Sequence, residues 1–193
     1  MKRFALICLL TNMLTLPVYA ALPEGHPAPN FEVRASQGGK DFSFSLKENL
    51  KNGPVVVYFY PSAYTGGCNI QAHTFALEHD KFVAAKATVV GVSLDNIERL
   101  NDFSKDPEYC AGKFPVASDA DGSIAKSYDL KIKEAKLGKT DSRGVEITHG
   151  FAERTTFIVT PDGKIAATIE GVKPAENVAK ALAVVQKLAT GGQ

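Results

Sequence analysis

The chain has 193 residues, with 22 basic and 21 acidic side chains, and its formal net charge is +1. So balanced a charge argues against nucleic acid or an anionic membrane surface as a partner. The length suits one domain with a sizeable core, and no stretch beyond the first twenty residues is apolar enough to cross a membrane.

The first twenty residues have the pattern of a secretory signal peptide. Lys2 and Arg3 form a short positive start, an apolar run too short to span a bilayer follows, and Ala20 precedes the expected cleavage point. The alternative is an apolar anchor that is never removed. Cleavage leaves residues 21–193, in which the basic side chains fall from 22 to 20 against 21 acidic ones, so the net charge becomes −1. We expect an exported protein, periplasmic if its source is bacterial.

The rest of the chain has two predicted hairpins and three single strands between them. Residues 31–36 and 41–46 alternate apolar and polar side chains around Gln-Gly-Gly-Lys, which predicts a β-hairpin. Buried strands are predicted at residues 54–60 and 87–94, and a short third strand at 114–119. A last hairpin is predicted over residues 154–171, closed by the turn Pro161-Asp162-Gly163.

Helices are predicted between these strands. They cover residues 68–86, 95–106 with Asp95 or Asn96 as the cap, 123–130 and 174–188. The first is expected to bury Ala72, Phe75, Ala76, His79, Phe82 and Val83, and the last Val178, Ala181, Leu182, Val185 and Leu188. The polar residues 131–150 are interpreted as a surface loop. This order predicts an α/β domain with a mixed sheet and helices on both faces.

Two cysteines, Cys68 and Cys110, remain after export, and in an oxidising compartment they are first of all a candidate disulfide. A helix that starts near Gly66 or Gly67 places Cys68 in its first turn, where unpaired N–H groups and the helix dipole favour a thiolate. The two glycines let other atoms approach the backbone closely.

The helix end alone does not suffice to make a thiol reactive. A thiol whose pKa falls from about 8.5 to about 6 needs roughly 3.4 kcal/mol of preference for its charged form. A helix end supplies about 0.3–1 kcal/mol, and about 2 kcal/mol in good geometry. A second positive group is needed, and Arg154 is the candidate because its strand could lie beside the one that ends at Pro61. Arginine suits the role because it stays charged and offers a fork of donors.

The stretch "FYPSAYTGGC" resembles the peroxiredoxin signature, Pro-x-x-x-Thr-x-x-Cys after an apolar strand, with Pro61, Thr65 and Cys68 as its fixed residues. The arginine of that family's site fits Arg154. The resemblance covers nearly all of residues 22–190. It implies a thioredoxin-like fold and a thiol-dependent peroxidase for hydrogen peroxide and organic hydroperoxides, with no metal or organic cofactor. In that chemistry Thr65 hydrogen-bonds the peroxide or the thiolate, and Pro61 shields the site. Backbone N–H groups and Arg154 stabilise the leaving oxygen, and Cys68 becomes a sulfenic acid.

The match is closest to the Q-type, or bacterioferritin-comigratory-protein, subgroup. One form of it has a second cysteine five residues after the first, where this chain has His73. In another form the second cysteine lies on the following helix, and Cys110 fits that region. Many members carry glutamate three residues after the reactive cysteine, where this chain has Gln71.

Cys110 is therefore the expected resolving cysteine. Its segment carries Pro107, Gly112 and Pro115 and is interpreted as a helix end that can open locally. We expect a reduced fold in which the two sulfurs are too far apart to bond, then local unwinding, an intramolecular disulfide, and recycling by a thioredoxin-like reductant. A monomer or weak dimer is expected.

Two alternatives stay open. One is a non-catalytic exported thioredoxin-like binding module with a structural Cys68–Cys110 disulfide. The other is an exported thiol–disulfide oxidoreductase, although the chain has no Cys-x-x-Cys. A metal site is disfavoured because the helical spacing of Cys68, His73 and His79 does not place all three on one face.

Overall fold

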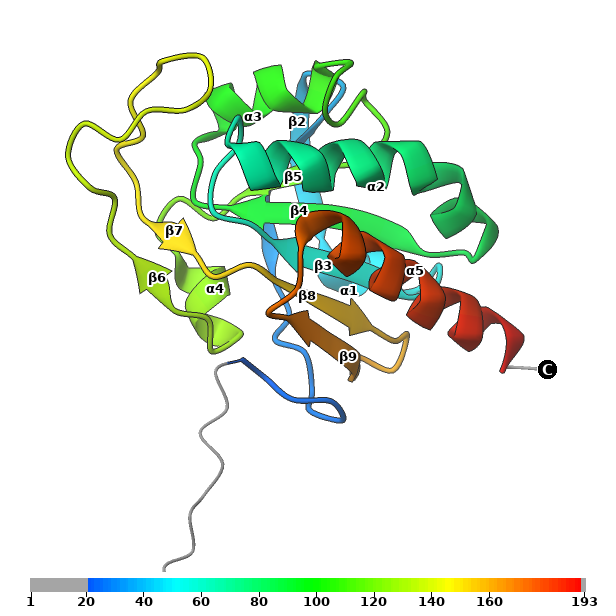
Figure 1. Cartoon of the computed structure of the whole chain (residues 1–193). Helices are drawn as coiled ribbons and strands as arrows, with labels where there is room; N and C mark the ends of the chain where they lie inside the picture. The colour runs from blue at the N-terminus through cyan, green and yellow to red at the C-terminus, as the bar shows by residue number, and fades with distance from the viewer. Residues whose placement is uncertain (1–20, 192–193) are drawn as a thin grey trace, which may run out of the picture.

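The structure is a computed structural model that describes residues 21–191; the expected signal peptide, residues 1–20, lies outside the described residues. Its strands are, in chain order, β1 (Glu32–Gln37), β2 (Lys40–Ser45), β3 (Val55–Phe59), β4 (Thr88–Ser93), β5 (Val116–Ser118), β6 (Ile132–Lys133), β7 (Phe151–Ala152), β8 (Thr155–Val159) and β9 (Ile165–Glu170). Seven of them form one sheet in the order β2-β1-β5-β4-β3-β8-β9, and β6 pairs with β7 beside it (Figure 1).

The sheet is mixed, as the sequence predicts. β3 is parallel to β4 and β4 to β5, whereas β8 is antiparallel to both β3 and β9. The register of β3 with β8 sets Phe59 opposite Thr155 and Val55 opposite Val159. The residue before Thr155 therefore lies just beyond the end of β3, where the chain leaves the sheet for the next helix.

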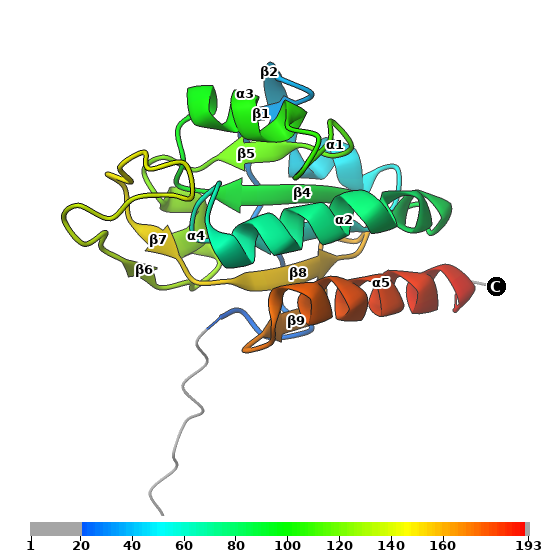
Figure 2. The ribbon, with the colours of Figure 1, turned by 45° about the horizontal axis from the view of Figure 1, so that its top comes forward.

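Five helices cover the two faces of this sheet: α1 (Leu46–Leu50), α2 (Gly66–Ala84), α3 (Ile97–Lys105), α4 (Ser123–Ser127) and α5 (Pro174–Thr190). Because successive strand residues point to opposite faces, β3 divides its side chains between two cores. Val56 and Tyr58 pack with α2, α3 and α5, which lie together on one side in Figure 2. Val57 and Phe59 pack on the other side with α1 and α4. This is the thioredoxin-like α/β architecture.

Several local predictions need correction. Val83 is 56% exposed rather than buried, because it follows Phe82 by one residue, about 100° around the helix, and only Phe82 faces the core. Residues 131–150 are not wholly a surface loop, since Ile132 pairs with Ala152 and the segment buries Ile147. Helix α1 was not predicted; its N-cap is Ser45, whose hydroxyl accepts a hydrogen bond from the backbone N–H of Glu48.

The remaining core predictions hold with small differences. The stripe of α2 buries Ala72, Phe75 and Phe82, and Ala76 and His79 are half-buried at its edge. In α5, Leu188 is half-buried against the core, and the other four predicted residues are buried. Within residues 21–191, no helix is both long and apolar enough to cross a membrane.

Candidate active site

The predicted reactive cysteine lies at the junction of β3 and α2. The chain leaves β3 at Phe59, and α2 begins at Gly66 with Thr65 as its N-cap residue. Cys68 is the third residue of the helix and is 2% exposed. The first N–H groups of a helix have no partner within it, so the amides of this turn are available to an anion beside the sulfur.

Arg154 contacts Cys68, as the sequence predicts. The pairing of β8 with β3 carries Arg154 to the end of β3, and its Nη2 donates to Cys68 Sγ over 3.2 Å. A Cβ built on Gly67 would lie 3.2 Å from the same Nη2, whereas one on Gly66 would meet open space. Of the two glycines, Gly67 is therefore the one that allows the guanidinium to approach the helix.

A buried chain of amides holds the other side of Arg154. Arg154 Nη1 donates to Gln71 Oε1, and Gln71 Nε2 donates to Asn177 Oδ1 over 2.9 Å. The same Oδ1 accepts from Thr156 Oγ1 at 2.6 Å, and Asn177 Nδ2 donates to the carbonyl of Ile169 at 3.2 Å. Gln71 thus has a place in the site although it is not a carboxylate.

Thr65 uses its single hydroxyl proton inside the loop. Its Oγ1 donates to the carbonyl of Ser62 over 2.8 Å, which leaves the lone pairs of the oxygen free to accept a proton donor. Thr65 and Pro61 are both half-buried, so the loop is partly open to solvent on this side. Within the site, the Thr65 oxygen is therefore available only as an acceptor while it keeps this hydrogen bond.

The loop 61–65 rests on Asp95, which the sequence offered only as a helix cap. The N-cap of α3 is instead Asn96, whose Oδ1 accepts from Arg99 N at 2.9 Å. Asp95 is fully buried, and its carboxylate accepts from Ser62 Oγ at 2.8 Å and from the backbone N–H of Ala63 at 2.7 Å. Two hydrogen bonds thus attach the backbone and one side chain of the loop to the end of β4.

Asp95 is paired with Arg99 and with His149, whose ring is a cation when it is protonated. His149 Nε2 lies 2.8 Å and Arg99 Nε 2.9 Å from its Oδ1. Burial raises the pKa of Asp95, but the hydrogen bond and charge of His149 and the N–H of Ala63 outweigh it and hold the pKa below its ordinary value. Burial likewise lowers the pKa of His149, and the contact with Asp95 outweighs it and raises the pKa above 6.5.

The geometry of His149 explains the raised pKa. Its Nδ1 faces the carbonyl of Gly150 at 2.8 Å, and its Nε2 faces a carboxylate, so both ring nitrogens must donate. Ser62 Oγ lies 3.5 Å from the same Nε2 that contacts Asp95. Because one ring nitrogen faces both groups, Ser62, His149 and Asp95 cannot act as a nucleophile–base–acid relay.

Tyr64, the residue before Thr65, has a strained backbone. Its φ is +58°, a left-handed conformation that aromatic residues rarely adopt. The backbone N–H of Ser142 donates to its carbonyl at 2.9 Å, and the guanidinium carbon of Arg143 lies 3.3 Å from the centroid of its ring. Tyr109 packs edge-on against the same ring at 5.5 Å between centroids. Contacts from two distant segments therefore maintain this conformation.

Cys110 lies in the turn after α3 and is also buried. Burial and, to a lesser extent, Asp106 raise its pKa well above the ordinary value, so the thiol is protonated in this fold. Cys68 and Cys110 are both free. His73, on the outer side of α2, has its Nδ1 2.9 Å from the carbonyl of Glu108, two residues before Cys110. This contact ties the turn to the helix that carries Cys68.

Several site residues escaped sequence reasoning. The sequence indicates Asp95 only as a possible helix cap, and it gives no partner for His149 or Asn177. A polar residue within the apolar stripe of the last helix, directly before Val178, was the one available signal for Asn177. Arg99 and Asp141, whose side chains pair at 2.8 Å, had no signal in the sequence.

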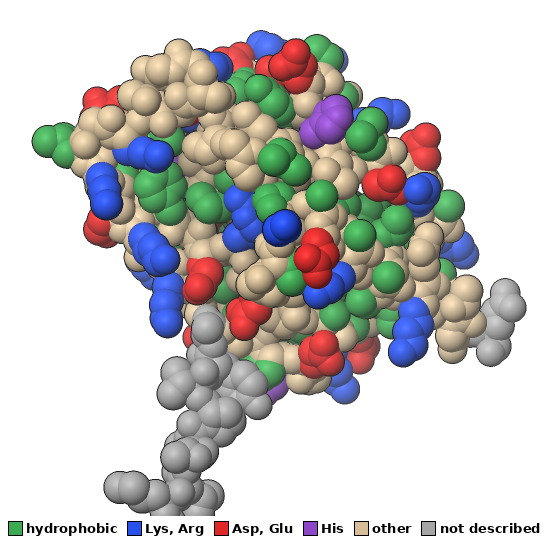
Figure 3. All heavy atoms as spheres, in the orientation of Figure 1, with side chains coloured by type: hydrophobic (Ala, Val, Ile, Leu, Met, Phe, Trp, Pro, Cys, Tyr) green, Lys and Arg blue, Asp and Glu red, His purple; other side chains and the backbone are tan. Residues whose placement is uncertain are grey.

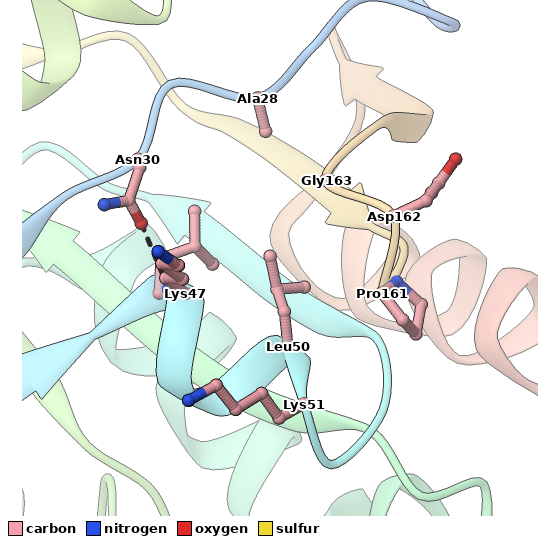
Figure 4. A pocket seen from close by; sticks show the side chains of 9 residues that line it. Ala28, Asn30, Lys47, Leu50, Lys51, Pro161, Asp162 and Gly163 are labelled. Atoms are coloured by element: carbon pink, nitrogen blue, oxygen red, sulfur yellow. Dashed lines mark hydrogen bonds between the residues drawn. The ribbon is translucent and has the colours of Figure 1, made fainter.

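Two further surface features are a hollow and a basic edge. A hollow of about 510 Å³ opens between α1 and the turn from β8 to β9, lined by Lys47, Leu50 and Pro161 among others (Figure 4). It belongs to the end of the sheet where β3 begins, opposite the cysteine. Basic side chains gather along the edge formed by β6 and the following loop (Figure 3). In the part of the chain that the structure describes, no group of three potential metal ligands comes together.

Known proteins are similar to this chain over most of their length. Bacillus subtilis YkuU is 31% identical over 175 residues, covering 87% of this chain and 89% of its own. Peroxiredoxin Bcp from the same species is 27% identical over 164 residues, covering 85% of this chain and 95% of its own. The crystal structure of peroxidoxin BcpB from Mycobacterium tuberculosis superposes with a TM-score of 0.71 at 27% identity, covering 86% of this chain and 98% of that one.

The family model described as the AhpC/TSA family matches residues 25–168, which include Pro61, Thr65, Cys68, Cys110 and Arg154. That match spans well over half of the chain. Together with the thiol at the helix start and the guanidinium beside it, it identifies the chain as a member of the AhpC/TSA family of peroxiredoxins, which are thiol peroxidases.

Proposed function

We propose that the chain reduces hydrogen peroxide and organic hydroperoxides through Cys68, resolves the product with Cys110, and is recycled by a thioredoxin-like protein. The observation that carries the first step is the 3.2 Å contact between Arg154 Nη2 and Cys68 Sγ in the first turn of α2. A cation and unpaired amides face one sulfur there, and they stabilise a thiolate and the charge of a leaving oxygen.

In the first step the thiolate of Cys68 attacks the peroxide oxygen that carries hydrogen. An S–O bond forms while the O–O bond breaks, and two electrons pass from sulfur to the leaving oxygen. That oxygen takes up a proton and departs as water or an alcohol, and Cys68 remains as a sulfenic acid. Thr65 accepts the peroxide O–H, Arg154 stabilises the leaving oxygen, and Pro61 limits access of water to the loop.

In the second step the thiolate of Cys110 attacks the sulfenic sulfur. An S–S bond forms, and the hydroxyl group leaves as water after it takes up a proton. The reductant then exchanges its dithiol for this disulfide. Cys110 is buried with a raised pKa, so its turn must open and meet water before the thiolate forms. The placement of Cys110 after α3 and the resemblance to peroxiredoxin Bcp support assignment to the Q-type subgroup.

We also propose that residues 1–20 are removed on export and that the enzyme works as a monomer or weak dimer outside the cytoplasm, in the periplasm of a bacterial source. The charge and apolar pattern of the first twenty residues support the proposed export. The amino-terminal sequence of the exported protein should begin at Ala21. A protein that still begins at Met1 contradicts the proposal.

The decisive experiment is stopped-flow oxidation of the reduced protein by hydrogen peroxide and by an organic hydroperoxide. We expect rapid single-turnover oxidation that Cys68→Ser abolishes, followed by an intramolecular Cys68–Cys110 disulfide visible by mass spectrometry. Peroxidase turnover in Cys68→Ser contradicts the first step. A Cys68–Cys110 bond that resists reduction in the folded protein, together with no peroxide consumption, would indicate a binding module with a structural disulfide instead.

A further inference from the structure

Asn177 is a polar side chain buried beneath the site, on the first turns of α5. It is 1% exposed and lies on the helix face that also buries Val178 and Ala181 in the core. Burial of an amide without partners costs free energy, so the position requires hydrogen bonds. Asn177 has them on both ends of its amide, and one of its partners is Gln71.

The partners of Asn177 allow only one orientation of its amide. Its oxygen faces two donors, Thr156 Oγ1 at 2.6 Å and Gln71 Nε2 at 2.9 Å. Its nitrogen donates to the carbonyl of Ile169 at 3.2 Å. A flipped amide would direct its NH₂ group at the NH₂ group of Gln71 and its oxygen at a carbonyl oxygen. Both contacts are unfavourable in a buried site.

The orientation of Asn177 fixes that of Gln71 in turn. Because Gln71 gives its NH₂ group to Asn177, it must present its oxygen to Arg154 Nη1. Nη2 of the same guanidinium is then directed at Cys68 Sγ. Since the guanidinium is planar and rigid, a hydrogen bond to one nitrogen restricts where the other can lie. Gln71 and Asn177 carry no charge, so they hold Arg154 without neutralising it.

We propose that Asn177 is a positioning residue for the peroxidase reaction, which acts on Cys68 through Gln71 and Arg154. The proposal rests on the function proposed above. The C-terminal helix then contributes more than core packing: its first turns fix which atom of Gln71 faces the arginine. Loss of the Asn177 acceptor leaves the buried NH₂ group of Gln71 without a partner, so the side chain shifts toward another acceptor and no longer holds Arg154 Nη1 in place beside the sulfur.

The test is a double-mutant cycle with Asn177→Leu, Gln71→Leu and the double variant. Two readouts are measured in each: single-turnover oxidation of Cys68 by hydrogen peroxide, and alkylation of Cys68 by iodoacetamide near neutral pH. We expect each single variant to lose about tenfold in the oxidation rate, the worth of one hydrogen bond to a charged group. The double variant should be no slower than Gln71→Leu, because Asn177 acts through that residue.

Additive losses, or no loss in Asn177→Leu, overturn the proposal. Val178→Ala is the control for a merely structural effect: it weakens the same helix in the core but leaves the amide chain intact, so both rates should be unchanged. If Asn177→Leu does not fold, Asn177→Ala takes its place in the same cycle with the same expectation. Should the unmodified protein fail to react with peroxide, the proposed function fails, whereas the alkylation cycle still decides whether Asn177 acts on Cys68.

Discussion

Arg154 Nη2 lies 3.2 Å from Cys68 Sγ, although the two residues are 86 positions apart in the chain. β8 brings the arginine to the end of β3, and the first turn of α2 brings the cysteine to the same point. The contact therefore depends on the sheet register, on the start of the helix and on the absence of a side chain at Gly67. Each of these can be tested separately.

Gly67→Ala should slow the oxidation of Cys68, and Gly66→Ala should not. A Cβ at Gly67 would lie 3.2 Å from Arg154 Nη2 and 3.4 Å from Pro174 Cγ, so the guanidinium must move by a few tenths of an ångström. At Gly66 a Cβ meets open space, and alanine favours a helix by up to about 1 kcal/mol. Stopped-flow oxidation and thermal unfolding of both variants check this; equal oxidation rates in the two would contradict the argument.

Arg154→Lys should reduce the oxidation rate by about tenfold to a hundredfold. The guanidinium contacts Cys68 and Gln71 at once with two nitrogens, and an ammonium group cannot reproduce both hydrogen bonds. The control is Arg34→Lys, which changes an exposed ion pair with Asp41 in the first hairpin and should leave the rate unchanged. A lysine variant that oxidises as fast as the original enzyme would show that the simultaneous contact of two guanidinium nitrogens is not required.

Cys110→Ser should spare the first oxidation of Cys68 but abolish steady turnover with a thioredoxin-type donor. Without a second thiol the sulfenic acid persists and is oxidised further to the sulfinic acid. Single-turnover kinetics, coupled turnover and mass spectrometry of the oxidised protein measure the three consequences. An unchanged steady-state rate would exclude Cys110 from the mechanism.

His73→Ala should accelerate disulfide formation after the sulfenic acid has formed. The ring of His73 ties α2 to the carbonyl of Glu108 in the turn that carries Cys110, and this contact must break when the turn opens. Loss of one hydrogen bond predicts a rate increase of roughly two- to tenfold if opening limits the step. Thr74→Ala is the matched control, since its hydroxyl bonds only within α2, to the carbonyl of Ile70.

The rate is measured by quenching with an alkylating reagent at successive times and counting unmodified cysteines by mass spectrometry. The first oxidation of Cys68 should be the same in both variants. Disulfide formation as slow in His73→Ala as in the unmodified protein would show that opening of this turn does not limit the reaction.

The stability that His149 contributes should fall as pH rises. Its pKa in the fold is raised above 6.5 by the contact with Asp95. The stabilisation of the fold by this contact is therefore complete below the unfolded pKa of about 6.5, and it is lost as pH rises through the folded pKa. The pKa of Asp95 is lowered, so its own contribution is lost only under acidic conditions, as pH falls through its folded pKa. Ser62, Arg99 and the carbonyl of Gly150 also face this pair.

Urea unfolding of the original protein and of His149→Gln checks this. The difference in unfolding free energy between the two should be larger at about pH 6 than at about pH 9, because the imidazolium exists only at the lower pH. A difference that stays constant or grows with pH would show that His149 is held as a neutral ring.

The order of the elements and the place of Cys68 in the first turn of a helix could be predicted, because both follow from local sequence patterns. Alternating and continuous apolar runs predicted the hairpins and the buried strands, and the glycines before Cys68 predicted the helix start to within two residues. Pro61, Thr65, Cys68 and Arg154 followed from a signature of fixed spacing and one arginine at a strand start.

Only the tertiary structure decided what surrounds these residues. By sequence, Asp95 and Asn96 are equally suitable as the N-cap of α3. In the structure Asn96 is the cap, and Asp95 is buried beneath the loop that precedes Cys68. His149 and Asn177 gained their roles from contacts across 54 and 106 positions of chain, with Asp95 and Gln71 respectively. Helix and strand patterns reflect neighbours within a few residues, whereas these partners are set by the register of the sheet and the packing of α5, which no local pattern encodes.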